Sequence, residues 1–178
     1  MQCSVFIATS LDGFIARSDG DIDWLMDADT SDPPEDTGYF SFIETIDCLV
    51  MGRNSLEKVL TFPEWPYEGR RVVVMSRSMR DVPSQVTGKF EYFNGSPEEL
   101  VTKLNTEGCH RLYIDGGQVI QSFLRAGLIT DLCITTIPIL LGDGIPLFGP
   151  LEKDVKLRHV STKTFQSGFV ETNYQVVK

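Results

Sequence analysis

The sequence has few of the residues that build metal centres and disulfide frameworks. It contains two histidines, His110 and His159, with no partners at metal-ligand spacing. Its four cysteines lie far apart and form no Cys-x-x-Cys pair. We therefore expect no metal site. Reduced, mostly buried thiols of this kind are typical of a cytoplasmic protein.

Long apolar runs and an excess of positive charge are also missing. No stretch approaches the roughly 20 apolar residues of a membrane span, and the N-terminus lacks the basic region and cleavage pattern of a signal peptide. The net charge of −9 repels polyanions on average. The sequence therefore predicts a cytoplasmic protein that binds neither nucleic acid nor membrane. Because no linker or repeat interrupts the chain, we expect one domain over residues 1–178.

Three well-known site motifs are absent as well. The chain has no Gly-x-Gly-x-x-Gly fingerprint, no Gly-Lys-Ser/Thr of a Walker loop and no Gly-x-Ser-x-Gly elbow. Two isolated histidines do not complete a Ser–His–Asp triad. Any nucleotide site in this chain must therefore use a different arrangement.

A glycine pair at the end of a short apolar run is the first candidate. Residues 112–114 read as a buried strand, Gly116 and Gly117 follow it, and apolar residues then recur at helical spacing from Val119 to Leu128. Such a turn places the free N–H groups of a helix N-terminus beside a backbone without Cβ atoms, where a phosphate can approach. An ordinary glycine turn is the alternative.

Two other strand ends carry related residues. Residues 48–51 read as a strand that runs into Gly52 and Arg53 at the start of a helix, and residues 72–75 read as a strand followed by Ser76 and Arg77. Ligands of open α/β sheets bind at the carboxyl ends of strands, and arginine matches the geometry of a phosphate monoester. Together these features predict a dinucleotide with a 2′-phosphate. Three plain helix caps and two surface arginines are the rival interpretation.

The remaining elements complete an α/β pattern. We expect strands over residues 4–9, 90–93 and 128–137, a helix from Pro34 or Glu35 with Phe40 and Ile43 in its apolar stripe, and a capped helix over 97–105. Residues 155–165 and 169–177 alternate as a closing antiparallel hairpin. Residues 19–24 and 29–37 read as solvated loop. Strands alternating with helices predict a mostly parallel sheet covered on both faces.

These motifs, in this order, resemble the dihydrofolate reductase superfamily, and most of all the branch containing the reductase domain of riboflavin biosynthesis. The matching stretches are residues 10–16, 50–55, 74–77, 114–117 and 138–148. The resemblance spans nearly the whole chain, and the last stretch is typical of the riboflavin-type branch. It implies a dihydrofolate reductase-like three-layer α/β/α fold with a mostly parallel mixed sheet, NADPH as hydride donor, and a homodimer.

The resemblance also implies cofactor contacts, residue by residue. Ala8 and Ile15 would flank the nicotinamide, and Arg53, Ser76 and Arg77 would hold the 2′-phosphate. The pyrophosphate would lie along Asn54, Ser55, Gly117, Gln118 and Val119, with Gly52 and Gly116 completing the cofactor-binding set.

A proton donor and substrate contacts follow by position. Reduction of a C=N or C=O group needs a proton, and a carboxyl in an apolar pocket is a sensible source. Asp36 matches the catalytic acid of the folate enzymes, with Phe40 one turn later as a substrate contact. Asp29 is the competitor, and a favourable charge in the first helical turn is the plain alternative for Asp36. Arg70 matches an arginine that grips the folate tail.

Three functions are consistent with this pattern. The first is an NADPH-dependent reductase of a small heterocycle, of the 5-amino-6-(5-phosphoribosylamino)uracil reductase type. The second is dihydrofolate reductase. The third is an NADPH-binding module without catalysis. The zinc deaminase that accompanies many riboflavin enzymes is missing here, because no His-x-Glu with Pro-Cys-x-x-Cys occurs.

Overall fold

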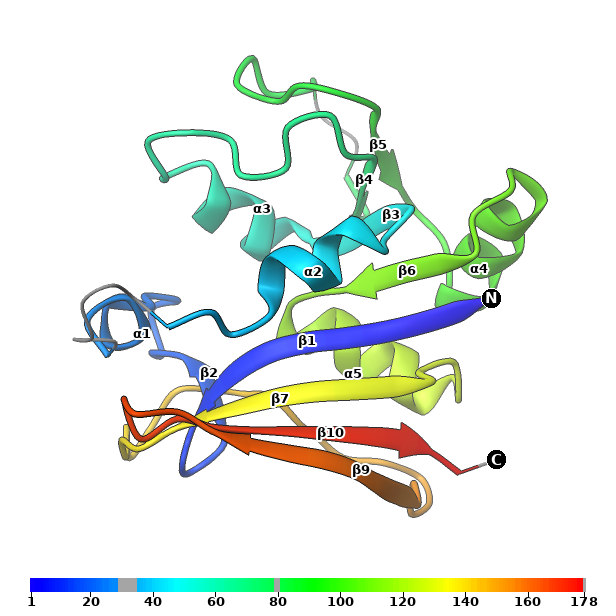
Figure 1. Cartoon of the computed structure of the whole chain (residues 1–178). Coiled ribbons are helices and arrows are strands. Elements are labelled where there is room, and N and C mark those ends of the chain that lie inside the picture. The colour runs from blue at the N-terminus through cyan, green and yellow to red at the C-terminus, as the bar shows by residue number, and fades with distance from the viewer. Residues whose placement is uncertain (29–34, 79–80, 178) are drawn as a thin grey trace.

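A computed structural model describes residues 1–28, 35–78 and 81–177 and is built around one eight-stranded mixed sheet (Figure 1). The strand order is β5-β4-β3-β6-β1-β7-β10-β9. The strands are β1 (Gln2–Ser10), β3 (Cys48–Gly52), β4 (Val72–Met75), β5 (Phe90–Phe93), β6 (Arg111–Ile114), β7 (Asp131–Ile137), β9 (Leu157–Thr164) and β10 (Val170–Val176). Neighbouring strands from β5 to β7 are parallel, whereas β10 is antiparallel to β7 and β9. The expected mostly parallel sheet with a closing antiparallel hairpin is confirmed.

Helices cover both faces of the sheet. α2 (Tyr39–Glu44) and α3 (Arg53–Val59) pack on one face, and α4 (Pro97–Thr106) and α5 (Gly117–Arg125) pack on the other (Figure 1). Alternate residues of the central strands feed the two cores, since Val50 joins the α4/α5 side while Leu49 and Met51 join the α2/α3 side. The three-layer α/β/α architecture is therefore confirmed. Within the described part of the chain, no helix is both long and apolar enough to cross a membrane.

The predictions for residues 19–40 need correction. The helix expected from Pro34 or Glu35 begins only at Tyr39, because Gly38 adopts a left-handed conformation with φ of 78° and separates Asp36 from the helix. Phe40 does not join the apolar stripe, because it is 76% exposed. The loop expected over residues 19–24 gives way to a short helix, α1 (Asp23–Met26), whose Trp24 is buried.

The loops that leave β1 and β7 are tied together. β2 (Phe14–Ala16) pairs with β8 (Ile145–Pro146) in a separate two-stranded sheet. The Asp12 carboxylate accepts hydrogen bonds from the Leu141 and Gly142 N–H groups, at 3.2 and 2.7 Å. The apolar Phe14 in the loop after β1 is thus paired with Pro146. The strand expected over 128–137 begins only at Asp131.

Candidate active site

The two glycine turns meet at one edge of the sheet. β3 and β6 are parallel neighbours, with Val50 paired to Ile114, so their carboxyl ends lie side by side. A methyl group added at Gly116 would overlap the Ser55 Oγ, and one added at Gly52 would lie 3.3 Å from Val119 Cγ2. Gly116 also has a φ of 85°, a backbone conformation that residues with a side chain rarely adopt. The structure therefore brings together turns that are more than 60 residues apart in the sequence and that the pattern assigned to one ligand.

Ile15 joins the same region from the loop after β1. A Cβ atom at Gly117 would lie 3.1 Å from both Ile15 Cδ1 and the Pro146 carbonyl oxygen. Ala8 lies further along, where it packs against a cluster of buried apolar residues that contains Trp24. Ile15 thus lies against the Gly116–Gly117 turn, whereas Ala8 belongs to β1, the strand next to β6.

The two arginines follow neighbouring strands. Gly52 pairs with Met75 across β3 and β4, so Arg53 and Ser76 follow directly on paired residues. Arg53 and Arg77 are exposed, and Arg53 Nε lies 3.7 Å from Glu57 Oε1. The Ser76 hydroxyl is engaged in its own turn, donating to the Ser78 carbonyl oxygen at 2.8 Å. Asn54 and Gln118 are exposed beside the turns.

Asp115, which the sequence motifs did not indicate as a functional residue, lies at the carboxyl end of the central strand β6. Asp115 follows the last residue of β6 and precedes Gly116. Burial raises its pKa to about 6, although the Gly116 N–H and the Tyr113 hydroxyl act in the opposite direction. The Tyr113 hydroxyl donates to the Phe6 carbonyl oxygen at 2.9 Å and lies 3.5 Å from Asp115 Oδ1. The sequence indicates Asp115 only by its position, because it is an acidic residue directly after a buried strand and before two glycines.

Tyrosine side chains lie near that carboxyl on the α2 side of the sheet, and Arg70 lies near one of them. Burial, followed by the charge of Asp115, raises the pKa of Tyr39 to about 12, while the Arg70 charge lowers it. Burial and the same carboxylate also raise the pKa of Tyr67. Half-buried Arg70 donates its backbone N–H to the Tyr67 carbonyl oxygen at 3.0 Å. The predicted substrate contact Arg70 therefore lies within the electrostatic range of Tyr39.

The predicted catalytic acid lies elsewhere. Asp36 is exposed, and its Oδ1 accepts the Gly38 N–H at 2.7 Å, so it occupies a turn rather than an apolar pocket. Phe40 is exposed, with its ring centroid 5.9 Å from that of Tyr39. Asp29 lies outside the described residues. The role of Asp36 in catalysis stays a prediction.

Comparison with known proteins decides the family. Residues 3–170 match the model of the RibD C-terminal domain. The chain belongs to that family. A crystal structure of a putative riboflavin biosynthesis protein from Shewanella sp. PV-4 is 41% identical over 100% of both chains, with a TM-score of 0.94.

Two further proteins resemble this chain, one in sequence and one in fold. The uncharacterized protein YwjB of Bacillus subtilis is 36% identical over 90% of each chain. Dihydrofolate reductase from Enterococcus faecalis, solved in complex with NADP(H) and RAB-propyl, is 17% identical over 99% of this chain and 97% of that one, with a TM-score of 0.66. The last similarity shows a shared fold. The resemblance to the riboflavin reductase branch is thus confirmed, and so is the dihydrofolate reductase-like fold.

Proposed function

We propose that this family member is an NADPH-dependent reductase of a small heterocycle, of the riboflavin-pathway type. The observation that carries the proposal is Asp115, a carboxyl with a pKa of about 6 between the glycine turns and the tyrosines. Family membership supports the class of reaction. The description of the Shewanella relative supports the type of pathway.

The residues at the glycine turns fit a pyrophosphate. α5 begins at Gly117 with Gly116 as N-cap, and this glycine supplies no side chain to cap the first N–H groups. These groups, beside a backbone without Cβ atoms, are available to an anion. Asn54, Ser55, Gln118 and Val119 would surround it. Arg53, Ser76 and Arg77 would hold a 2′-phosphate, and Ala8 and Ile15 would flank the nicotinamide.

Asp115 would supply the proton that the reduction requires. When bound, NADPH supplies a hydride to the electrophilic carbon of the substrate. The Asp115 carboxyl holds a proton and gives it to the nitrogen or oxygen that gains negative charge. A pKa of about 6 leaves roughly a tenth of the carboxyl protonated at pH 7, which suits a general acid in the neutral range. The buried Tyr67 and Tyr113 and the half-buried Tyr39 lie on that side.

Cofactor discrimination tests the proposal. NADPH is expected to raise the melting temperature well above the value with NADH at equal concentration, because two arginines meet the 2′-phosphate. Arg53→Ala and Arg77→Ala should shrink the difference. Arg125→Ala is the matched control, since Arg125 is an exposed arginine in the last turn of α5. Equal shifts for both cofactors in the unmodified protein would remove the 2′-phosphate assignment.

Dihydrofolate reductase is the second candidate, favoured by the position of Arg70 beside Tyr39 and Tyr67. That guanidinium would pair with a carboxylate on the substrate. Steady NADPH oxidation with dihydrofolate, lost in Arg70→Ala, would identify this activity. Turnover of a reducible aminopyrimidine alone supports the first proposal. Cofactor binding without turnover of either substrate would identify a binding module.

A further inference from the structure

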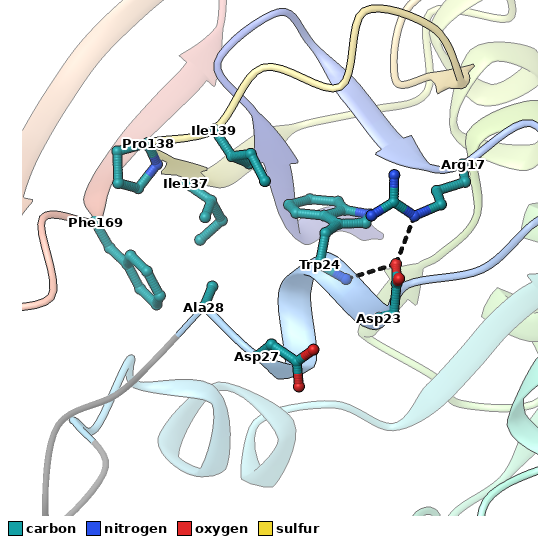
Figure 2. A pocket seen from close by; sticks show the side chains of 9 residues that line it. All are labelled: Arg17, Asp23, Trp24, Asp27, Ala28, Ile137, Pro138, Ile139 and Phe169. Atoms are coloured by element: carbon teal, nitrogen blue, oxygen red, sulfur yellow. Dashed lines mark hydrogen bonds and ion pairs between the residues drawn. The ribbon is translucent and has the colours of Figure 1, made fainter.

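Two carboxyls of the ligand cleft lie in opposite surroundings. The cleft continues beside α1 as a cavity of about 330 Å³, whose Trp24 wall belongs to the apolar cluster against which Ala8 packs (Figure 2). There, Arg17 Nε lies 2.6 Å from Asp23 Oδ1, and this hydrogen bond is the largest cause that lowers the pKa of Asp23 (Figure 2). Asp23 therefore holds no proton in the neutral range, whereas burial raises the pKa of Asp115 to about 6.

Tyr113 brings a hydrogen-bond donor close to Asp115. The Asp115 N–H donates to the Val50 carbonyl oxygen at 2.9 Å and so continues the ladder of β6. Residues two positions apart in a strand point to the same face, so both side chains lie on the α2 side while Ile114 between them packs on the α5 side. The Tyr113 hydroxyl lies 3.5 Å from Asp115 Oδ1, which is longer than an ordinary O–H···O hydrogen bond.

The Tyr113 hydroxyl also has a second acceptor. It donates to the Phe6 carbonyl oxygen at 2.9 Å. The last pair between β1 and β6 is Ser4 with Tyr113, so Phe6 lies two residues beyond the end of that pairing. A phenol carries a single hydrogen. The Phe6 carbonyl and an ionised Asp115 therefore compete for the same donor.

Packing fixes the Tyr113 ring but leaves its hydroxyl hydrogen free to turn. Tyr113 is 6% exposed, and its ring meets Phe42 edge to face, with 5.1 Å between the centroids. Phe42 in turn stacks on Phe6, with 4.8 Å between the centroids. A ring held in this cluster keeps its place while the hydrogen rotates about the C–O bond. The two donor states therefore differ without any movement of the ring.

We propose that Tyr113 is a positioning residue whose hydroxyl changes acceptor when Asp115 gives up its proton. This role rests on the proposed reductase activity. While Asp115 is protonated, the hydroxyl donates to the Phe6 carbonyl. Once that proton has passed to the substrate nitrogen or oxygen, the hydroxyl turns to the new carboxylate and stabilises a charge that burial disfavours. Asp115 therefore releases its proton more readily than burial alone would allow.

The other groups near Asp115 act on it differently. Tyr39 and Tyr67 interact with Asp115 through charge, and Arg70 acts on Tyr39 in the same way. Burial raises the pKa values of both tyrosines above the ordinary 10, so both are neutral while Asp115 titrates. Tyr67→Phe is therefore the matched control, because it removes a buried hydroxyl close to Asp115 without changing the charge around it.

Carbon NMR tests the role in the absence of cofactor and substrate. The protein is isotope-labelled at the aspartate carboxyl carbons and at the tyrosine Cζ atoms. The Asp115 Cγ resonance, assigned by its loss in Asp115→Asn, should titrate near pH 6. The Tyr113 Cζ resonance, assigned by its loss in Tyr113→Phe, should shift with the same midpoint because its hydroxyl changes acceptor. The Tyr67 resonance, which senses only charge, should shift less.

The Tyr113→Phe variant separates positioning from structure. It keeps the ring and removes the hydroxyl, so it should raise the pKa of Asp115 by about 1, a roughly tenfold change in proton affinity. The decline of kcat with pH should move upward by the same amount. Tyr67→Phe should leave both midpoints near those of the unmodified protein. A purely structural role for Tyr113 would lower kcat without moving the midpoint.

Two results would overturn the proposal. One is a Tyr113 resonance in the unmodified protein that does not follow the Asp115 titration, and this result is decisive even where Tyr113→Phe fails to fold. The other is an Asp115 midpoint that is the same in Tyr113→Phe and in the unmodified protein. Absence of NADPH oxidation, with both titrations as expected, would count against the reductase proposal instead.

Discussion

Asp115 is the residue on which the proposed chemistry depends. Asp115→Asn keeps the shape of the side chain and removes the transferable proton, so kcat should fall by about 10²-fold or more. In the unmodified enzyme, kcat should decline as pH rises through about 6, because only the protonated carboxyl donates. Steady-state NADPH oxidation across pH 5–9 measures both effects.

Asp36→Asn is the matched control for that experiment. It removes a carboxylate that is exposed and bonded to the Gly38 N–H. If Asp115 is the donor, this variant retains the pH profile. A large loss in Asp36→Asn with normal activity in Asp115→Asn would return the role to the residue that the sequence indicated.

The same carboxyl should make stability, like activity, decline as pH rises, because its ionised form is the unfavourable one in the folded state. Its folded-state pKa of about 6 is above the ordinary 3.8, so the folded state binds the proton more tightly than the unfolded state. The associated stability is present below about pH 4 and is lost as pH rises through 6, by up to about 3 kcal/mol. Asp115→Asn should therefore be more stable than the unmodified protein at pH 8 by chemical denaturation. An unchanged or lower stability would show that the carboxyl is not desolvated.

The position of Asp115 was readable from the sequence, but its burial was not. An acid between a buried strand and two glycines is visible as a pattern. Burial raises its pKa, and neighbours such as Tyr39 and Tyr67, whose own pKa values its charge raises, arrive from distant segments. The same limit applies to Trp24, since the acidic residues around it predict solvent exposure while Ile137 and Phe169 bury it.

Among the elements, local signals decided which helices were predicted correctly. α4 follows Ser96 with a complete capping box, in which Ser96 Oγ accepts the Glu99 N–H at 3.2 Å, and its start was predicted to the residue. α2 has no side-chain cap, and its start depends on the left-handed conformation of Gly38. Apolar periodicity alone therefore placed it four or five residues too early.

The paired loops after β1 and β7 allow a prediction at this scale. Asp12 receives the Ser10 hydroxyl at 2.6 Å in addition to the two N–H groups from residues 141 and 142. The Ser10 hydrogen bond is the largest cause that lowers the pKa of Asp12. Asp12→Ala should release the loop that carries Ile15 to Gly117 and raise the KM for NADPH by about tenfold. Initial-rate kinetics at saturating substrate measure the change.

Asp143→Ala is the control for the loop prediction. Asp143 lies in the same segment and accepts hydrogen bonds from the exposed Ser18 hydroxyl and its neighbouring Gly144 N–H. Its KM for NADPH should stay near that of the unmodified protein. If Asp12→Ala also leaves KM unchanged, the loop is held by the β2–β8 pairing instead.

At the scale of the whole molecule, the order of strands and helices was sufficient to predict the architecture. Parallel pairing places all carboxyl ends at one edge, which is why Gly52, Met75 and Ile114 lead into the same region. The spatial strand order was not contained in local patterns, because it depends on how distant apolar faces pack. The cavity beside α1 arises from that packing and has no signature along the chain.

The exposed edge of the sheet leads to a final prediction. β9 is the last strand in the order, all of its residues are exposed, and Leu157 and Val160 are 41% and 54% exposed. An edge strand with apolar side chains is a template for pairing with a second copy. We therefore expect a homodimer, with a light-scattering mass near twice 19.9 kDa. Val160→Lys should shift it toward monomer, whereas Gln166→Lys in the adjoining hairpin loop should not. A monomer at all concentrations would show that β9 is protected by its own polar residues.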